Sequence, residues 1–281
     1  MTESLTPPRN ESIKAESGNS LKARHIGFIN HVGLATLVKR EVGRFLKVYS
    51  QTIIAPVVTT LLFFVVFALA FGGNERLFGE VPFLVFLAPG LIMMTMAQNA
   101  FANSSSSLII GKVQGNIIDV LMPPLSSLEI FSGFLIGSVL RGLCVGAVAI
   151  AVIALFVPMP VHSAGVIIAF SVLGNVMMGT MGIMAGMWAE KFDHIAAFTN
   201  FFVTPLTFLS GTFYSIDILP EPWKTLAFFN PFFYMIDGFR HGFIGHAPDV
   251  AMIGIYVLLA VNVVLIGLTY ALIQSGYKIK H

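Results

Sequence analysis

Charge is scarce in this sequence. Charged residues fill only 11% of its 281 positions, whereas an ordinary soluble domain carries about 25%. Hydrophobic residues make up 56% of the chain and include 26 Phe and 13 Met. Such a chain has too little polar surface to stay in water, so the composition excludes the soluble classes and indicates an integral membrane protein. The net charge of +2 is too small to favour nucleic acid as a partner.

Cysteine is nearly missing, and no cleavable leader is recognisable. Cys144 is the single cysteine, which excludes a disulfide framework, and its apolar surroundings predict a small buried side chain. Residues 1–30 contain Pro, Ser, Asn, Glu and Lys, without the apolar block of about 7–15 residues that a signal peptide needs. We therefore expect residues 1–30 to form a flexible cytosolic tail.

Motifs for nucleotide binding and for catalysis are absent as well. A Walker loop reads G-x-x-x-x-G-K-[ST], but the only Gly-Lys pair, at 111–112, has Ser106 in place of the first glycine. The chain contains no H-E-x-x-H, and "FLSGTF" has Phe208 where a G-x-S-x-G turn needs glycine. We expect no catalytic residue, bound cofactor or resident metal, and hence no enzyme.

Long uncharged stretches are abundant. A membrane-spanning helix needs about 20 mostly apolar residues to cross roughly 30 Å of hydrocarbon. Pro158 and Pro160 divide one long uncharged run, from Gly142 to Ala189, into two segments. The sequence therefore predicts an all-α protein with six spans. We place them at about 53–72, 83–103, 138–157, 163–187, 196–214 and 250–275.

The third span has its own start signal. Ser126 and Glu129 stand at the spacing of a capping box, so the helix is expected to begin there and enter the membrane near Ser138. Arg141 then lies about one turn inside. We expect its side chain to extend to the interface, with contact to a substrate as the alternative.

The distribution of basic residues predicts the orientation. An even number of spans puts both termini on one side. Lys and Arg are more numerous in the loops of that side, which makes both termini cytosolic by the positive-inside rule. The terminal side has Lys39, Arg40, Arg44, Lys47, Lys112, Lys191, Lys278 and Lys280, and the opposite side has Arg76, Lys224 and Arg240.

Three segments are expected to lie on the cytosolic face. Residues 34–49 have apolar residues on one helical stripe and basic residues elsewhere, as in an amphipathic helix lying in the interface; a soluble core helix is the alternative. Residues 104–127 are expected to form the loop between the second and third spans. Within it, residues 112–124 predict a short amphipathic helix stopped by two prolines, with an apolar face of Val113, Ile117, Val120 and Leu121. This helix is either a docking site or a plain connector. Residues 189–194 place a phenylalanine among charges, either as a knob for a partner or as a turn that folds back.

The stretch "FFNPFFYMIDGFRHGFIG" (228–245) is too short and too polar to span. Asn230 can cap a helix that starts at Pro231, and Asp237 and Arg240 are then neighbours at i,i+3. This pattern predicts a re-entrant helical hairpin anchored at the extracytoplasmic rim, between the fifth and sixth spans. Two alternatives remain, a metal site formed by Asp237 with His241 and His246, and a proton relay through the Asp237–Arg240 pair.

Four segments resemble the ABC-2 type permeases of ATP-binding-cassette exporters. They are "LAPGLIMM" (87–94), "GNIIDVLMPPLSSLEIFSGFLIG" (115–137), "TPLTFLSGTFYSIDILPEPW" (204–223) and "NPFFYMIDGFRHGFIG" (230–245). The resemblance covers the chain from about residue 35 and implies one ABC-2 type transmembrane domain over 31–281. Asn116 and Asp119 depart from the family, which more often has Thr and Glu there.

The resemblance also implies roles for individual residues. Two cytosolic segments, together with the 34–49 helix, would meet a separate ATPase subunit. Their contact residues would be Lys112, Gln114, Gly115, Asn116, Asp119, Glu190, Lys191, Phe192 and Asp193. The re-entrant motif would comprise Asn230, Pro231, Tyr234, Asp237 and Arg240.

By the same resemblance, two copies of the chain would form an export pathway in a bacterial inner membrane. ATP and Mg²⁺ would bind to the partner ATPase. The substrate, whether a drug, a lipid or a lipid-linked glycan, is left open. The alternative is an ion-coupled secondary transporter, but that class needs ionisable residues inside its spans, and Arg141 is essentially the only one here.

Overall fold

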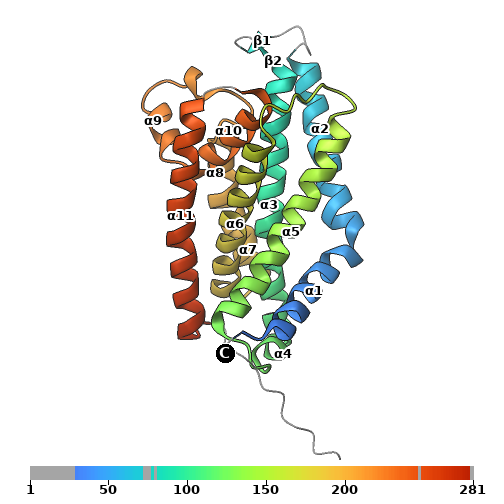
Figure 1. The fold of residues 1–281 in the computed structure, drawn as a ribbon, viewed down its shortest axis with the longest axis vertical. Coiled ribbons are helices and arrows are strands. Elements are labelled where there is room, and N and C mark those ends of the chain that lie inside the picture. The colour runs from blue at the N-terminus through green and yellow to red at the C-terminus, as the bar shows by residue number, and fades with distance from the viewer. Residues whose placement is uncertain (1–28, 72–76, 79–80, 246–247, 279–281) are drawn as a thin grey trace, which may run out of the picture.

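The computed structural model describes residues 29–71, 77–78, 81–245 and 248–278, and it is almost entirely helical (Figure 1). The long helices are α1 (His31–Lys47), α2 (Ala55–Ala70), α3 (Phe83–Val113), α5 (Ser127–Ile153), α6 (Ala164–Trp188), α10 (Pro231–Ile244) and α11 (Pro248–Ser275). The short elements are η1 (Ser50–Ile54), β1 (Leu77–Phe78), β2 (Val81–Pro82), α4 (Ile118–Leu121), α7 (Phe192–Phe198), η3 (Thr199–Val203), α8 (Thr204–Phe208), η4 (Ile216–Ile218) and α9 (Trp223–Phe228).

The all-helical membrane fold expected from the sequence is confirmed, with a two-residue antiparallel pair, β1–β2, as the sheet content of the described chain. Five helical stretches are long and apolar enough to cross a bilayer, and each overlaps an expected span. They are Ser50–Ala70, Phe83–Val113, Ser127–Ile153, Ala164–Trp188 and Val250–Ser275. The expected tail through residue 28, together with Arg76, His246 and Lys280, lies outside the described residues.

The fifth expected span, 196–214, has a different form. Here the helix is built of α7, the π-helical turn η3 and α8, which are seven, five and five residues long. It ends at Phe208, and the chain then turns through Gly211, whose φ of 70° is left-handed. At 1.5 Å per residue this helix is only about 25 Å long.

The broken helix nevertheless runs from one end of the bundle to the other. It begins just after α6, beside α4, and Gly211 near its far end accepts a hydrogen bond from Arg240, which also binds Phe86 at the start of α3. The two ends of the described chain meet beside α4, where Asn30 binds Pro124 and Lys278 binds Glu190 (Figure 1). We call this the α4 end, and the opposite one the α10 end.

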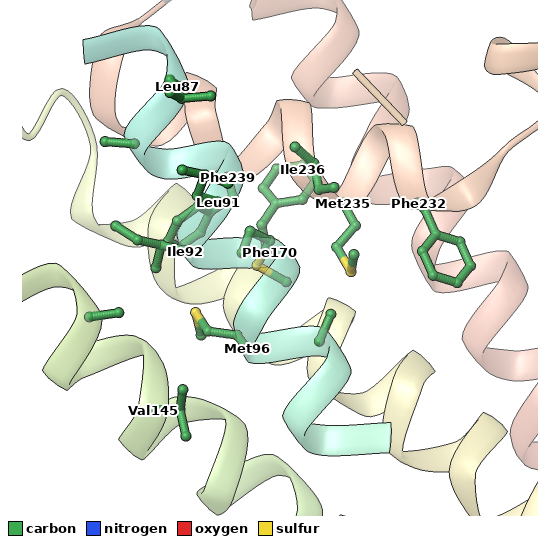
Figure 2. Close-up of a cluster of buried hydrophobic side chains, with 14 of the residues drawn as sticks. Leu87, Leu91, Ile92, Met96, Val145, Phe170, Phe232, Met235, Ile236 and Phe239 are labelled. Carbon is green, nitrogen blue, oxygen red and sulfur yellow. The ribbon is translucent and has the colours of Figure 1, made fainter. Parts of the chain in front are cut away.

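Helix α3 is the centre of the bundle. In its most apolar stretch 83% of the residues are buried, against 17% for the α2 stretch and 22% for α11, so the latter two form outer walls. Figure 2 shows α3 side chains facing α5, α6 and α10. The labelled residues are Leu87, Leu91, Ile92 and Met96 of α3, Val145 of α5, Phe170 of α6, and Phe232, Met235, Ile236 and Phe239 of α10.

Helix α3 is also about ten residues longer than the span expected at 83–103. The polar run that follows was interpreted as a loop, but it remains helical because its hydroxyls find partners inside the bundle. Ser104 donates to the carbonyl of Gly179 on α6 at 2.8 Å, and Ser107 donates to Glu41 on α1 at 2.8 Å. Buried hydroxyls that are hydrogen-bonded in this way no longer oppose burial.

The capping box predicted at the start of the third long helix is present. The Ser126 hydroxyl accepts from the Glu129 amide at 3.3 Å, and the Glu129 carboxylate accepts from the Ser126 amide at 2.6 Å. The same carboxylate accepts from the amide of Asn30, the residue that caps α1. One acid therefore joins the starts of α1 and α5, and the apolar side of α1 packs against α5 through Leu37.

Candidate functional site

The segment between α3 and α5 forms the tip of the α4 end. Gly115, with φ of 74°, reverses the chain after α3, and only α4 continues as helix before the prolines. The amphipathic helix expected over 112–124 is therefore much shorter than predicted. Its first residues belong to α3, because the left-handed turn at Gly115 interrupts the helix.

The α4 segment has a buried and an exposed side. Ile117 and Val120 are buried against Leu108 of α3, Met187 of α6 and Ile273 of α11. Val113, expected on the same face, is instead exposed. The polar residues turn outward, and the exposed ones are Gln114, Gly115, Asn116 and Asp119. The predicted polar side of this segment is therefore free to bind a partner.

Lys112 connects this segment to the second expected contact loop. Its ammonium group donates to the carbonyl oxygens of Met187 and, at 2.9 Å, Ala189 at the end of α6. A cation at a helix C-terminus compensates carbonyls that have no intrahelical donor. Lys112 is thus half-buried and holds two loops together, rather than projecting outward with the other expected contact residues.

The second loop is fully accessible. Glu190, Lys191, Phe192 and Asp193 are all exposed, and Phe192 at 52% does not fold back onto the bundle. The Lys278 ammonium binds the Glu190 carboxylate at 2.7 Å and lowers the pKa of that carboxyl below its ordinary value. The two loops therefore lie side by side and form one surface. We call it the docking face, and define it by Gln114, Gly115, Asn116, Asp119, Glu190, Lys191, Phe192 and Asp193.

Replacing Lys112 with methionine is expected to loosen the docking face. The change removes a charge-assisted link that is worth about 1.5–3 kcal/mol when both partners are held. Trypsin should then cut faster after Lys191, which follows the released carbonyls. Lys39→Met, at an exposed position of α1, is the control and should leave the cleavage rate unchanged. Equal cleavage of both variants would mean that Lys112 does not stabilise the loop that follows α6.

At the α10 end, the segment for which a re-entrant hairpin is expected contains two helices, α9 and α10. The Asn230 side chain accepts from the Phe232 amide at 3.0 Å and donates to the carbonyl of Leu206 at 2.7 Å. Pro231 occupies the first turn of α10, and Tyr234 is half-buried with its ring against Phe233. Asn230 thus caps α10 and ties it to α8, a contact that sequence spacing did not predict.

Arg240 does more than the predicted pairing. It binds Asp237 at 3.0 Å, as expected, and also donates to the carbonyls of Phe86 at 3.1 Å and Gly211 at 2.8 Å. Its guanidinium lies 3.8 Å from the centroid of the Phe86 ring and is buried, while Asp237 reaches the surface. Arg240 therefore joins α10, α3 and the turn after α8.

The alternative metal site finds little support in this geometry. Asp237 is engaged by Arg240, and the His241 ring meets the His162 ring edge-on at 5.8 Å. His246 lies outside the described residues. Among the residues that the structure describes, no group of three or more His, Cys, Asp or Glu side chains could hold a metal ion.

A third feature was not predicted from the sequence. A cavity of about 530 Å³ opens on the side of the bundle between α2, α3 and the η3 turn, and we call it the lateral cavity. Its wall contains many uncharged polar side chains and no charged one. They include Gln51, Thr59, Thr95, Gln98, Ser106 and Thr204. The amides and hydroxyls at 98–107, inside an otherwise apolar helix, were the available signal.

Arg141 lies behind this cavity and not at the interface, which corrects the expectation that its side chain extends outward. It is only 9% exposed, and it donates to the Asn99 side chain at 2.9 Å. The physical reason is that α5 packs on α3 at this level, so a polar partner is available inside the bundle and the guanidinium need not reach for water.

Comparison with known proteins identifies relatives of this chain. The family model for ABC-2 type transporters matches residues 33–244. The inner membrane transport permease YadH of Escherichia coli strain K12 is 38% identical over 247 residues, which cover 87% of this chain and 96% of the relative. Nodulation protein J of Rhizobium leguminosarum bv. trifolii is 30% identical over 74 residues, covering 26% of this chain and 28% of that protein. This chain belongs to the ABC-2 type transporter family.

Proposed function

We propose that this chain is the membrane-spanning permease subunit of an ABC exporter. Two copies form the substrate pathway, and separate ATPase subunits bind at the docking face. The observation that carries the proposal is this face, in which two loops far apart in sequence expose polar residues side by side at one end of the bundle. Family membership and the printed name of the E. coli relative, a transport permease, support it.

The proposed topology has six crossings. The fifth in chain order is the broken helix of α7, η3 and α8, because it runs between opposite ends of the bundle and the described chain ends meet at one end. A helix of about 25 Å is close to the hydrocarbon thickness of roughly 30 Å. In this proposal the turn after α8, through Gly211, covers the remaining distance to the interface. The positive-inside rule places the α4 end in the cytosol, and the relative's name favours the inner membrane.

In this proposal the energy comes from outside the chain. ATP and Mg²⁺ bind to the partner, and this subunit is not itself an enzyme. Closure of the ATPase subunits pushes on the docking face, and the packing of Ile117 and Val120 together with the Lys112 link passes that motion to α3 and α6. Rigid-body movements of this kind switch the side to which a pathway opens. Helix α1 lies along the cytosolic interface, and Glu129 joins its start to α5.

The alternative, an ion-coupled carrier, is not favoured by any feature of the spans. Inside the five long apolar stretches, the charged residues are Lys112 and Glu129 near their cytosolic ends and Arg141. Proton- or ion-coupled carriers need acidic or basic groups near the middle of their spans. No described stretch supplies a carboxylate there.

Exposed positions on the docking face allow a direct test. Deleting 112–121 would also remove Lys112 and the buried residues Ile117 and Val120, so point changes are preferable. Asp119→Arg reverses an exposed charge, and Phe192→Asp replaces the exposed ring. Each should reduce co-purification of a Walker-loop ATPase about tenfold or more, because mismatched charges at an interface cost several kcal/mol. The ATPase is quantified by mass spectrometry after purification of the tagged chain from its native membrane.

The control is Glu221→Lys, a charge reversal on the exposed loop before α9 at the α10 end. It should leave the amount of ATPase unchanged. Undiminished ATPase with both docking-face variants would show that the partner binds elsewhere. If the wild-type chain retains no ABC ATPase and moves cargo by itself after reconstitution, the proposed function is wrong.

A further inference from the structure

The wall of the lateral cavity carries hydrogen-bonding groups that the protein does not use. Gln51, Gln98 and Thr204 line the cavity, and none of their side chains has a hydrogen-bond partner among the described residues. Gln98 is half-buried within α3, one of the helices long and apolar enough to cross a bilayer. An unpaired amide in such surroundings costs free energy unless a ligand or water binds it. The cavity is therefore equipped to bind a polar group.

Charged residues lie directly behind two of the lining residues. Arg44 donates to the Ser106 hydroxyl at 3.2 Å and to the carbonyl of Asn103 at 2.7 Å. Arg141 donates to Asn99 at 2.9 Å. Ser106 and Asn99 both belong to the cavity wall. Each guanidinium is thus separated from the cavity by one small polar side chain.

The two arginines are not balanced by the same number of acids. Glu41 pairs with Arg44 at 3.3 Å, and its other oxygen accepts from Ser107 at 2.8 Å. Arg141 has no carboxylate partner in the part of the chain that the structure describes, and the charge that acts on it is a second cation, Arg44. Its Nε is buried without an acceptor. The cluster of Glu41, Arg44 and Arg141 therefore carries one uncompensated positive charge.

We propose that the lateral cavity binds the anionic headgroup of an amphipathic molecule, and that Arg141 sets this preference. The proposal rests on the proposed function, in which the cavity belongs to the export pathway. An unpaired cation inside a low-dielectric bundle attracts a negative charge much more strongly than it would in water. The unused amides of Gln51 and Gln98 donate to phosphate or carboxylate oxygens, and Phe63 and Met94 on the same wall contact the apolar chain.

Arg141 is a positioning residue in this arrangement, since it reaches the cavity through Asn99 and does not line it. The positive charge of its guanidinium raises the electrostatic potential in the cavity, and its hydrogen bond orients the Asn99 amide. Its removal should consequently change the preference between headgroups of different charge. Binding of an uncharged or zwitterionic headgroup with the same acyl chains should be affected far less.

The test uses the full chain alone in phosphatidylcholine nanodiscs with two photoactivatable lipids of identical acyl chains, phosphatidic acid and phosphatidylcholine. Labelling is mapped by mass spectrometry to peptides that carry the cavity wall, around Thr59 and Gln98. In the wild type, phosphatidic acid should label these peptides about tenfold more than phosphatidylcholine. Arg141→Gln should bring the ratio close to one, and Arg141→Lys should retain most of it. Millimolar inorganic phosphate should not compete, because the ligand is an amphiphile. Displacement by phosphate would overturn the claim that the cavity requires an apolar chain on its ligand.

A second variant protects the test against misfolding of Arg141→Gln. Gln98→Glu changes a half-exposed wall residue without changing its shape, and its charge should lower phosphatidic acid labelling while sparing phosphatidylcholine. Arg40→Gln, at an exposed position of α1, controls for general attraction of acidic lipid and should have no effect. Equal labelling by both lipids in the wild type, or an unchanged ratio in Gln98→Glu, overturns the proposal. Because no ATPase is present, these results are independent of whether the docking face binds one.

Discussion

Replacing Arg240 with methionine is expected to lower the melting temperature of the protein sharply. The arginine is 3% exposed and holds the carbonyls of Phe86 and Gly211 as well as the carboxylate of Asp237. Methionine fills a similar volume but donates nothing, so these acceptors lose their donor inside the bundle. Leaving a buried acceptor without its donor costs about 1–3 kcal/mol for each group. Thermal unfolding followed by fluorescence-detected size exclusion should show a fall of roughly 10 °C.

Two further variants separate charge from geometry. Arg240→Lys retains the charge, but an ammonium group cannot reach both carbonyls and lie flat over the Phe86 ring, so we expect only partial recovery. Asp237→Asn retains the shape of the side chain but leaves the Arg240 guanidinium, 3% exposed, without its carboxylate, so it should also be strongly destabilising. If Arg240→Met melts within a degree or two of the wild type, Arg240 does not hold the α10 end together.

Gly182→Val is expected to separate the two central helices, α3 and α6. A Cβ at Gly182 would lie 2.4 Å from the carbonyl oxygen of Phe101 and 2.3 Å from the Ser104 hydroxyl. The hydroxyl can rotate, but the carbonyl belongs to α3 and can move only with the helix. Overpacking of this kind costs about 1–3 kcal/mol or more. Close helix contacts inside a membrane depend on small residues, so a larger side chain at Gly182 would not be tolerated.

Gly165→Val is the matched control because it lies on the same helix, α6, with nothing within 4 Å of an added Cβ. It should melt at or slightly above the wild-type temperature, since valine has a somewhat higher helix propensity than glycine. Equal destabilisation by both variants would attribute the effect to the loss of glycine itself and not to the contact with Phe101.

The sequence predicted features that depend on local chemistry. The capping box of Ser126 and Glu129, the cap at Asn230 and the Asp237–Arg240 pair all follow from side chains three or fewer positions apart, and all three are present. Five of the expected spans follow from uninterrupted apolar length. These signals are readable because neither the cap nor the apolar run needs information about distant parts of the chain.

Features that depend on distant partners were not predicted. The run Ser104–Ser107 was interpreted as part of a loop because its helical form needs acceptors on α1 and α6. Arg141 was assigned to the interface for the same reason, since Asn99 is separated from it by more than forty positions. Hydroxyl and amide side chains in a membrane segment are compatible both with a loop and with contact to a substrate. The choice between these depends on which helix packs against them. The lateral cavity was missed because three separate segments form it.

The π-helical turn η3 has a consequence for comparing this chain with its relatives. A π-helical turn contains one residue more than the α-helical turn that it replaces, so it shifts the angular phase of all following side chains by about 100°. Thr199 and Val203 of η3 and Thr204 just after it line the lateral cavity. A relative that lacks one residue here would keep the path of its backbone but present a different set of side chains to the lateral cavity. A gap in this turn would therefore alter the lining of the cavity even where the aligned residues of α8 are identical.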